Sequence, residues 1–200
     1  MDKASIKRAE IINAAYKVFS EKGYHGARIE DITSELGIAQ GLPYRYFQNK
    51  LDIFNHVIDE IIKRIVVGIS EDAPDTADTL EEYVAQMQRG LDRLFDIFTE
   101  DPLTSRLLLL EALVINEETS RKIQEALDLC GKYSSRYVKN GIEKGFLRPD
   151  LQVEEMGHAF NAVILEASRR ILGSEDKAKA RESWKKAIID LMISGTAKHQ

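Results

Sequence analysis

Apolar residues recur every three or four positions along most of the chain, and this spacing is typical of amphipathic α-helices. No run of alternating β-branched residues predicts a strand. We therefore expect an all-α fold of about nine helices, in which a three-helix unit at the N-terminus precedes a C-terminal helical bundle. A polar stretch with a proline, residues 70–78, predicts a linker between two domains at residues 5–65 and 70–198.

The first domain opens with an amphipathic helix over residues 5–22. A short helix over residues 28–36 follows, with its apolar residues on one face, and Gly37 ends it. Residues 40–47 predict a second short helix. Two short helices joined by a glycine-containing turn form a helix-turn-helix over residues 28–47.

The second of these short helices carries side chains suited to nucleic acid. Gln40 and Arg45 can pair in a bidentate way with the edges of adenine and guanine. Tyr44 and the following Lys50 suit phosphate oxygens. Gly41 leaves a gap where the backbone can approach a duplex. The chemistry therefore favours a helix that reads a DNA groove.

The three aromatic residues of this helix have a second interpretation, because aromatic residues at helical spacing often belong to a core. We assign Phe47 to the core and Tyr44 to the surface. Both interpretations stay open for Tyr46.

Residues 19–54, FSEKGYHGARIEDITSELGIAQGLPYRYFQNKLDIF, resemble the N-terminal domain of the TetR family of transcriptional repressors. The runs E-K-G-Y, G-I-A-Q-G, Y-R-Y-F and N-K-L-D-I-F follow the order and spacing of that family, over about the first quarter of the chain. The resemblance implies that residues 28–47 bind DNA. It places the contacts at Arg28, Ala39, Gln40, Gly41, Leu42, Tyr44, Arg45, Tyr46 and Lys50.

Two residues depart from the family pattern. Thr33 stands where the family usually has alanine, and Pro43 stands where it usually has leucine in a T-L-Y triplet. A proline in the first turn of a helix is tolerated, because its missing N–H has no intrahelical partner there. We therefore expect Pro43 to be compatible with a short reading helix.

Composition places the chain among ordinary globular proteins. Its 200 residues are 44% hydrophobic and 30% charged. No apolar run reaches the roughly 20 residues that cross a bilayer, so we expect a cytoplasmic protein without a membrane partner. The single cysteine, Cys130, leaves no intrachain disulfide and no cysteine metal cluster, and we expect no metal and no cofactor.

The net charge of −5 is unevenly distributed. Residues 1–50 hold 8 basic and 6 acidic side chains, a net charge of +2, whereas the rest holds 20 and 27, a net charge of −7. A mildly positive first domain on an acidic second domain fits a small DNA-contacting unit attached to a module with another role.

The second domain is helical throughout by its apolar pattern. Asp78 and Glu81 predict a capping box at its first helix. Pro102 begins another helix, whose residues 107–114 are nearly all apolar. The first helix is expected over residues 78–99. Three further helices are expected over residues 117–144, 153–172 and 175–198.

A small-molecule pocket is expected among the helices of the second domain. Its supply of apolar and aromatic side chains predicts a hydrophobic or aromatic effector. Each candidate has plain core packing as its alternative. The candidates are Met87, Phe95, Phe98, Leu109, Tyr133, Tyr137 and Phe160.

The two C-terminal helices are apolar over so much of their circumference that they need more than one partner surface. A monomeric core is one explanation, and a two-fold interface between two chains is the other. The family resemblance implies a homodimer at this place. The expected interface residues are Phe160, Val163, Ile164, Ala167, Ile171, Trp184, Ile188 and Leu191.

These features predict a ligand-responsive transcriptional regulator that binds double-stranded DNA. We expect a homodimeric repressor, released from a palindromic operator by a small molecule. The alternative is a helical dimeric adaptor that binds a protein partner. Glu155 and His158 form one E-x-x-H pair, but di-iron bundles need a second copy, and no nucleotide-binding or hydrolase motif occurs. We therefore expect no enzyme, and a buried, inert Cys130.

Overall fold

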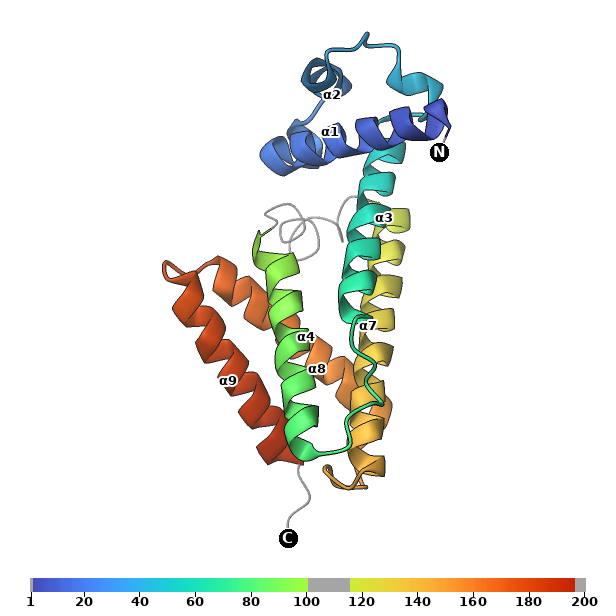
Figure 1. The fold of residues 1–200 in the computed structure, drawn as a ribbon. Coiled ribbons are helices and arrows are strands. Elements are labelled where there is room, and N and C mark those ends of the chain that lie inside the picture. Colours follow the sequence, from blue (N-terminus) through green and yellow to red (C-terminus); the bar gives the residue numbers. More distant parts are fainter. Residues whose placement is uncertain (1, 101–115, 197–200) are drawn as a thin grey trace. The chain divides into compact units, whose positions relative to one another are not determined.

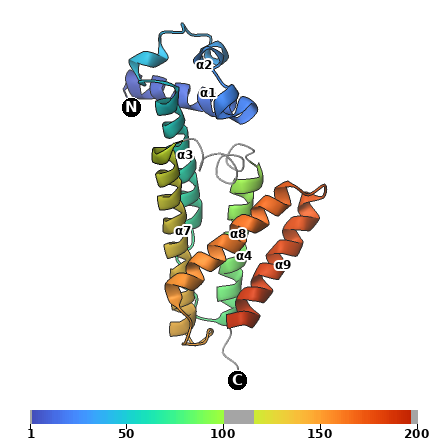
Figure 2. The ribbon, with the colours of Figure 1, turned by 180° about the vertical axis from the view of Figure 1, so that it is seen from behind.

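The computed structural model describes residues 2–100 and 116–196, and this part of the chain is helical without strands (Figures 1 and 2). The described residues form seven α-helices and one short 3₁₀ helix, so the all-α prediction is confirmed. The expected total was about nine helices. The helix predicted to begin at Pro102 lies outside the described residues.

The chain divides into two compact units, residues 1–63 and 64–200. The first unit contains α1 (Lys3–Gly26), α2 (Ile29–Leu36), the 3₁₀ helix η1 (Pro43–Arg45) and most of α3 (Lys50–Ile69). The boundary between the units lies within α3, before the polar stretch at residues 70–78.

Local signals in the sequence set both ends of α1. The Asp2 carboxylate accepts a hydrogen bond from the Ser5 N–H at 2.7 Å and caps the first turn. Gly23 has φ 70° and ψ 169°, a conformation that is essentially restricted to glycine. The regular helix therefore ends at this glycine, as its position in the sequence predicted.

Aromatic packing joins α1 to α3 in the core of the first unit. The rings of Phe19 and Phe54 meet edge to face with centroids 5.2 Å apart, and Tyr24 lies 4.7 Å from Phe54. The neighbouring residues Ile11 and Ile32 are fully buried. This apolar core fixes α1, α2 and the start of α3 relative to one another.

The second unit is a bundle of α4 (Leu80–Glu100), α7 (Glu117–Glu143), α8 (Val153–Leu172) and α9 (Lys177–Thr196). In Figure 2, α8 crosses α4 obliquely on its way from the end of α7 to the start of α9. One apolar core lies between these helices. Its buried members are Ala77, Tyr83, Met87, Leu91, Phe95, Val138, Leu147, Leu151, Phe160, Ile164, Ala167, Ile171, Ile188 and Met192.

The cap of α4 differs from the predicted one. Thr79 Oγ1 accepts from the Glu82 N–H at 3.1 Å, while the Glu82 carboxylate accepts from the N–H groups of Thr79 and Asp78. The reciprocal capping box is thus Thr79 with Glu82, one residue later than the Asp78 and Glu81 pair that we predicted. Both pairs have the spacing of a capping box in the sequence, so the spacing alone could not show which pair forms it.

The polar stretch at residues 70–78 is part of the second unit and is bonded to its helices. The Asn140 amide donates to the Pro74 carbonyl at 2.9 Å, and Arg136 pairs with Asp75 at 2.8 Å. Arg89 and Arg93 both donate to the Asp72 carboxylate. Burial alone would raise the pKa of Asp72, but these guanidinium groups outweigh it and hold the pKa below its usual value.

Charged side chains attach α9 to α4. Arg181 reaches the carboxylates of Asp92, at 3.1 Å, and Asp96, and Lys185 Nζ lies 3.2 Å from Asp92. The helix face that carries Arg181 and Lys185 is therefore turned toward α4 within one chain. Ile188, one turn beyond Lys185, is buried.

Small residues allow α7 and α8 to cross closely. A Cβ atom on Gly157 would lie 2.2 Å from Ser135 Oγ and 2.5 Å from the Ser135 backbone nitrogen. A Cβ atom on Gly131 would meet the His158 ring at 2.2 Å. The backbones are in contact at this crossing, and the absence of side chains at Gly131 and Gly157 is what permits it.

Replacing Gly157 by alanine should lower the free energy of unfolding by about 1–3 kcal/mol, because the new methyl group overlaps backbone atoms of α7. Denaturant unfolding followed by circular dichroism measures this change. Gly90→Ala is the matched control, since a Cβ there meets no atom within 4 Å and alanine favours the helix. Equal stability of the two variants would contradict the close crossing.

Candidate functional site

The segment between α2 and α3 is a helical turn rather than the α-helix that we predicted over residues 40–47. Its hydrogen bonds join residues three apart: the Leu42 N–H donates to the Ala39 carbonyl at 2.9 Å, and the Arg45 N–H to the Leu42 carbonyl at 3.1 Å. Only Pro43–Arg45 form a regular 3₁₀ turn. Pro43 has no N–H to donate to the Ala39 carbonyl, so an α-helix that began at residue 40 would lack its first hydrogen bond.

Two buried residues anchor this turn to the first unit. Pro43 is buried, and Phe47 is 3% exposed, which confirms our assignment of Phe47 to the core. The Arg8 guanidinium lies over the Phe47 ring at 4.9 Å, and His56 meets the ring edge at 5.3 Å. The buried Phe47 side chain therefore attaches the turn to the core of the first unit.

Gly37 fixes the direction in which the chain leaves α2. Its φ of 62° and ψ of 36° place it in the left-handed region, where glycine has no steric penalty. The next residue, Ile38, donates its N–H to the Thr33 carbonyl at 3.0 Å and closes the helix end. Thr33 itself is buried with its hydroxyl bonded to the Glu30 carbonyl, so this departure from the family pattern leaves no unpaired polar group.

The predicted reading residues form one exposed stretch between these anchors. Leu42 and Tyr46 are half-buried, which answers the question left open for Tyr46: its ring is partly in the core. Tyr44 is 57% exposed. The exposed members of the set are Ala39, Gln40, Gly41, Tyr44 and Arg45.

Arg28 and Lys50 flank this stretch in different environments. Arg28 is exposed at the N-cap of α2, and its N–H donates to the Asp31 carboxylate at 2.8 Å. Lys50 is half-buried and donates to the carbonyls of Tyr24 at 2.8 Å and Ala27 at 3.0 Å. Its burial lowers the pKa of the ammonium group. Lys50 thus holds the turn between α1 and α2, with one donor left over.

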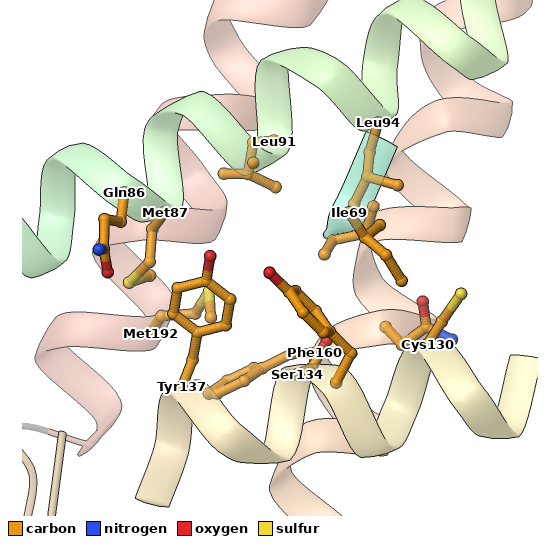
Figure 3. Close-up of a pocket in the computed structure, with 14 residues that line it drawn as sticks. Ile69, Gln86, Met87, Leu91, Leu94, Cys130, Ser134, Tyr137, Phe160 and Met192 are labelled. Carbon is orange, nitrogen blue, oxygen red and sulfur yellow. The ribbon is translucent and has the colours of Figure 1, made fainter. Parts of the chain in front are cut away.

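The second unit contains an apolar cavity of about 70 Å³ between α4, α7 and α8 (Figure 3). Figure 3 shows Gln86, Met87, Leu91 and Leu94 reaching it from α4, opposite Cys130, Ser134 and Tyr137 on α7. The full lining is Ile69, Gln86, Met87, Gly90, Leu91, Leu94, Cys130, Tyr133, Ser134, Tyr137, Phe160, Asn161, Ile164 and Met192.

The predicted pocket residues fall into three groups. Met87, Tyr133, Tyr137 and Phe160 line the cavity. Phe95 and Phe98 do not line it and are buried in the core, so their alternative interpretation holds. Leu109 lies outside the described residues.

Sequence reasoning missed the polar part of the lining. The lining includes three polar residues that we did not predict, Gln86, Ser134 and Asn161. Our pocket prediction used apolar and aromatic residues only. Gln86 immediately precedes Met87 and is 6% exposed. A buried glutamine inside an amphipathic helix is the feature that could have identified it.

The predicted dimer residues mostly face the core of their own chain. Phe160, Ile164, Ala167, Ile171 and Ile188 are all buried within a single chain, as the alternative of a monomeric core expects, and their part in a two-fold interface stays a prediction. Of the rest, Val163 and Trp184 are half-buried and Leu191 is 55% exposed. Amphipathic periodicity identified the apolar stripe but could not distinguish the partner that covers it.

The E-x-x-H pair on α8 is a surface feature. His158 Nε2 lies 3.6 Å from Asp128 Oδ1 on α7, and Glu155 is exposed. Among the described residues, no group of three or more acidic, histidine or cysteine side chains could hold a metal ion. No described helix combines the length and apolar content needed to cross a membrane.

Comparison with known proteins identifies the first unit. Residues 11–57 match the family described as bacterial regulatory proteins, tetR family. The fatty acid metabolism regulator protein of Bacillus subtilis is 26% identical over 189 residues, which cover 94% of this chain and 95% of that protein. Residues 11–57 are therefore identified as a domain of the tetR family, and the relatives support a TetR-family transcriptional regulator.

Further TetR proteins extend the similarity to the second unit. The transcriptional repressor SCO4008 of Streptomyces coelicolor is 27% identical over 196 residues, covering 92% of this chain and 95% of that one. The crystal structure of FadR from Bacillus subtilis in complex with stearoyl-CoA has a TM-score of 0.72 at 25% identity, covering 94% and 98% of the two chains. A TetR regulator from Chloroflexus aurantiacus shares the fold, with a TM-score of 0.79 at 18% identity over the whole of both chains.

These comparisons support a DNA-binding transcriptional regulator. Its predicted reading segment contains a 3₁₀ turn instead of an α-helix, and its cavity has polar residues on otherwise apolar walls.

Cys130 should be nearly inert in the native protein. Burial raises the pKa of its thiol to about 11, so at pH 8 about 0.1% is thiolate, and alkylation should be about 100-fold slower than for a thiol of pKa 9.0. The rate should rise with pH until the pH passes that raised pKa. Iodoacetamide labelling followed by mass spectrometry measures it, and the urea-unfolded chain is the control. Cys130 is half-buried, less than the full burial that we predicted, and equal rates for native and unfolded protein would contradict even this partial burial.

Proposed function

We propose that this protein is a homodimeric repressor that binds a palindromic DNA operator and is released when a small apolar molecule enters the second unit. The observation that carries the proposal is the exposed stretch from Ala39 to Arg45, anchored by buried Pro43 and Phe47. A surface turn rich in hydrogen-bonding side chains, held rigidly by a core aromatic, suits the reading of a DNA groove.

Base and phosphate contacts divide along this stretch. Gln40 and Arg45 would reach base edges, with Leu42 beside them for apolar contact with thymine. Tyr44 and Arg28 would bind phosphates. Lys50 could add a phosphate contact only through the single donor that its two carbonyl bonds leave.

The short turn limits how many bases one unit can read. Only Pro43–Arg45 are regular, so the recognition element is about one turn long instead of two. Few side chains then reach bases, and the affinity of one unit should come largely from phosphates. Two units acting together on two half-sites would restore specificity, which supports a palindromic operator.

Residues on α8 and α9 that the single chain leaves uncovered would form the dimer interface. Leu191 is the most exposed large apolar residue of α9, and Trp184 and Val163 are half-buried. Interfaces bury such residues at their centres, and tryptophan is frequent among those that dominate binding. A two-fold pairing of these helices would bring two reading turns into one dimer.

An apolar effector is supported by the lining of the cavity. FadR of Bacillus subtilis was solved with stearoyl-CoA, a ligand with a long apolar chain. The cavity here, at about 70 Å³, is below the roughly 300–1,000 Å³ of pockets for drug-sized ligands. We therefore propose a compact effector, or one whose entry widens the cavity.

Release would follow from a difference in affinity between two dimer geometries. The effector must bind more tightly to the geometry in which the two reading turns no longer match the half-sites. A coupling free energy of about 1–3 kcal/mol is typical of such linkage. Selection of bound sites from random DNA tests the proposal directly: a recovered palindrome supports it, and the absence of any enriched sequence contradicts it.

Arg45→Ala should weaken operator binding by about 1–3 kcal/mol and relax the preference at one base pair of each half-site. Fluorescence anisotropy on the selected operator and on single-base variants measures both effects. Arg121→Ala removes the same charge from an exposed position of α7 and should leave binding unchanged. A uniform loss on all sequences would instead make Arg45 a phosphate contact.

Leu191→Glu should raise the dimer dissociation constant at least about 10-fold, because it places a charge at the centre of the proposed interface. Light scattering after size exclusion over a range of concentrations measures the mass. Leu129→Glu is the matched control, since Leu129 is 46% exposed on α7. Equal dissociation constants for both variants would place the interface elsewhere.

A further inference from the structure

One buried oxygen in the wall of the cavity has no hydrogen-bond partner. The Gln86 side chain on α4 is 6% exposed and lines the cavity, and its Oε1 is unpaired among the described residues. A buried carbonyl oxygen without a donor is costly, so such atoms in native proteins call for a bound water or ligand.

The hydrogen bonds of its nitrogen fix the orientation of the Gln86 amide. Nε2 donates to Thr76 Oγ1 at 2.6 Å and lies 3.4 Å from the Ala73 carbonyl oxygen. The Thr76 hydroxyl already donates its own hydrogen to Ala73 at 2.8 Å. Thr76 Oγ1 and the Ala73 carbonyl oxygen can therefore only accept a hydrogen bond from Gln86. If the amide were flipped, Gln86 Oε1 would face these two acceptor oxygens without a hydrogen between them. The nitrogen faces the segment 73–76, and Oε1 is the atom left for another donor.

Most of the rest of the lining is apolar, and two of its other polar side chains are already paired. Figure 3 shows Gln86 beside Met87, near Tyr137 and Met192. The hydroxyl of Tyr133 donates to the Asp72 carbonyl, and the Asn161 amide donates to the Leu127 carbonyl. The Asp72 carboxylate is neutralised by two arginines. Gln86 Oε1 is the buried lining atom that is left without a partner among the described residues, and it can only accept.

We propose that the effector is a compact, uncharged molecule with an apolar body and one hydroxyl or N–H group that donates to Gln86 Oε1. This inference rests on the proposed effector role of the cavity and specifies the chemistry of its ligand. A carboxylate has no hydrogen to donate and would lose its hydration. An ether or ester would leave Oε1 unpaired, and the site should therefore reject it.

The experiment compares 4-ethylphenol with 1-ethyl-4-fluorobenzene on the full-length protein. The fluorine replaces the hydroxyl at nearly the same size but cannot donate. Isothermal titration calorimetry should give at least about 10-fold tighter binding of the phenol. 4-Ethylaniline, which carries an N–H donor, should follow the phenol, and 4-ethylbenzoate should not bind.

Gln86→Met keeps the length of the side chain and removes the acceptor. It should reduce the preference for the phenol over the fluoro compound to within about two-fold, whereas Gln88→Met, at an exposed position of the same helix, should leave it intact. If Gln86→Met does not fold, the probe series on the unaltered protein still decides. Equal binding of phenol and fluoro compound, no binding of either, or an unchanged preference in Gln86→Met would overturn the inference. A crystal structure grown with the phenol that shows a water alone on Oε1 would also do so.

A band-shift assay with the selected operator separates this inference from the proposed function. Gln86-dependent binding of the phenol without any release of DNA supports the chemistry of the site and counts against the effector role. Release of DNA by all three uncharged probes without regard to Gln86 supports the effector role and overturns the inference.

Discussion

The candidate site of the first unit depends on the burial of Phe47. The stretch between α2 and α3 is too short and too interrupted to hold itself by a helical ladder, since Pro43 lacks an N–H and only bonds between residues three or four apart close its turn. Its position is set by one ring in the core, with Arg8 over its face and His56 at its edge. Because the anchor points inward, the neighbouring polar side chains point outward, and exposure of Gln40 and Arg45 follows from the burial of Phe47.

A different constraint governs the second unit. Most of the apolar area of α8 and α9 is used within one chain: Ile164 and Ile171 face the same core as Ile188, and Arg181 and Lys185 fix α9 on α4. What is left for a second chain is the outer edge of these helices. The cavity lies between α4 and α7, where their side chains do not fill the space. The side chains that these helices turn toward each other therefore set both its size and its polarity.

The sequence was informative where local chemistry decides the structure. Gly23 and Gly37 ended helices as predicted, and Phe47 proved to be core. Periodicity predicted the described α-helices of the second unit but could not say which partner covers an apolar face, so the interface residues stay a prediction. It also predicted an α-helix at residues 40–47, where the structure has a 3₁₀ turn over Pro43–Arg45. Four of the predicted pocket residues line the cavity. Gln86 was missed, because a polar residue beside an apolar stripe can be recognised as part of a pocket only when its neighbours in space are known.

Gly23 has an effect that reaches beyond its own turn. With φ 70° and ψ 169°, it kinks α1 just before Tyr24, whose carbonyl accepts from Lys50 together with the carbonyl of Ala27. A residue with a Cβ atom would be strained in this conformation, so a substitution at Gly23 would also disturb both hydrogen bonds of Lys50. One glycine within α1 therefore supports the bonds that join the start of α3 to the segment before α2.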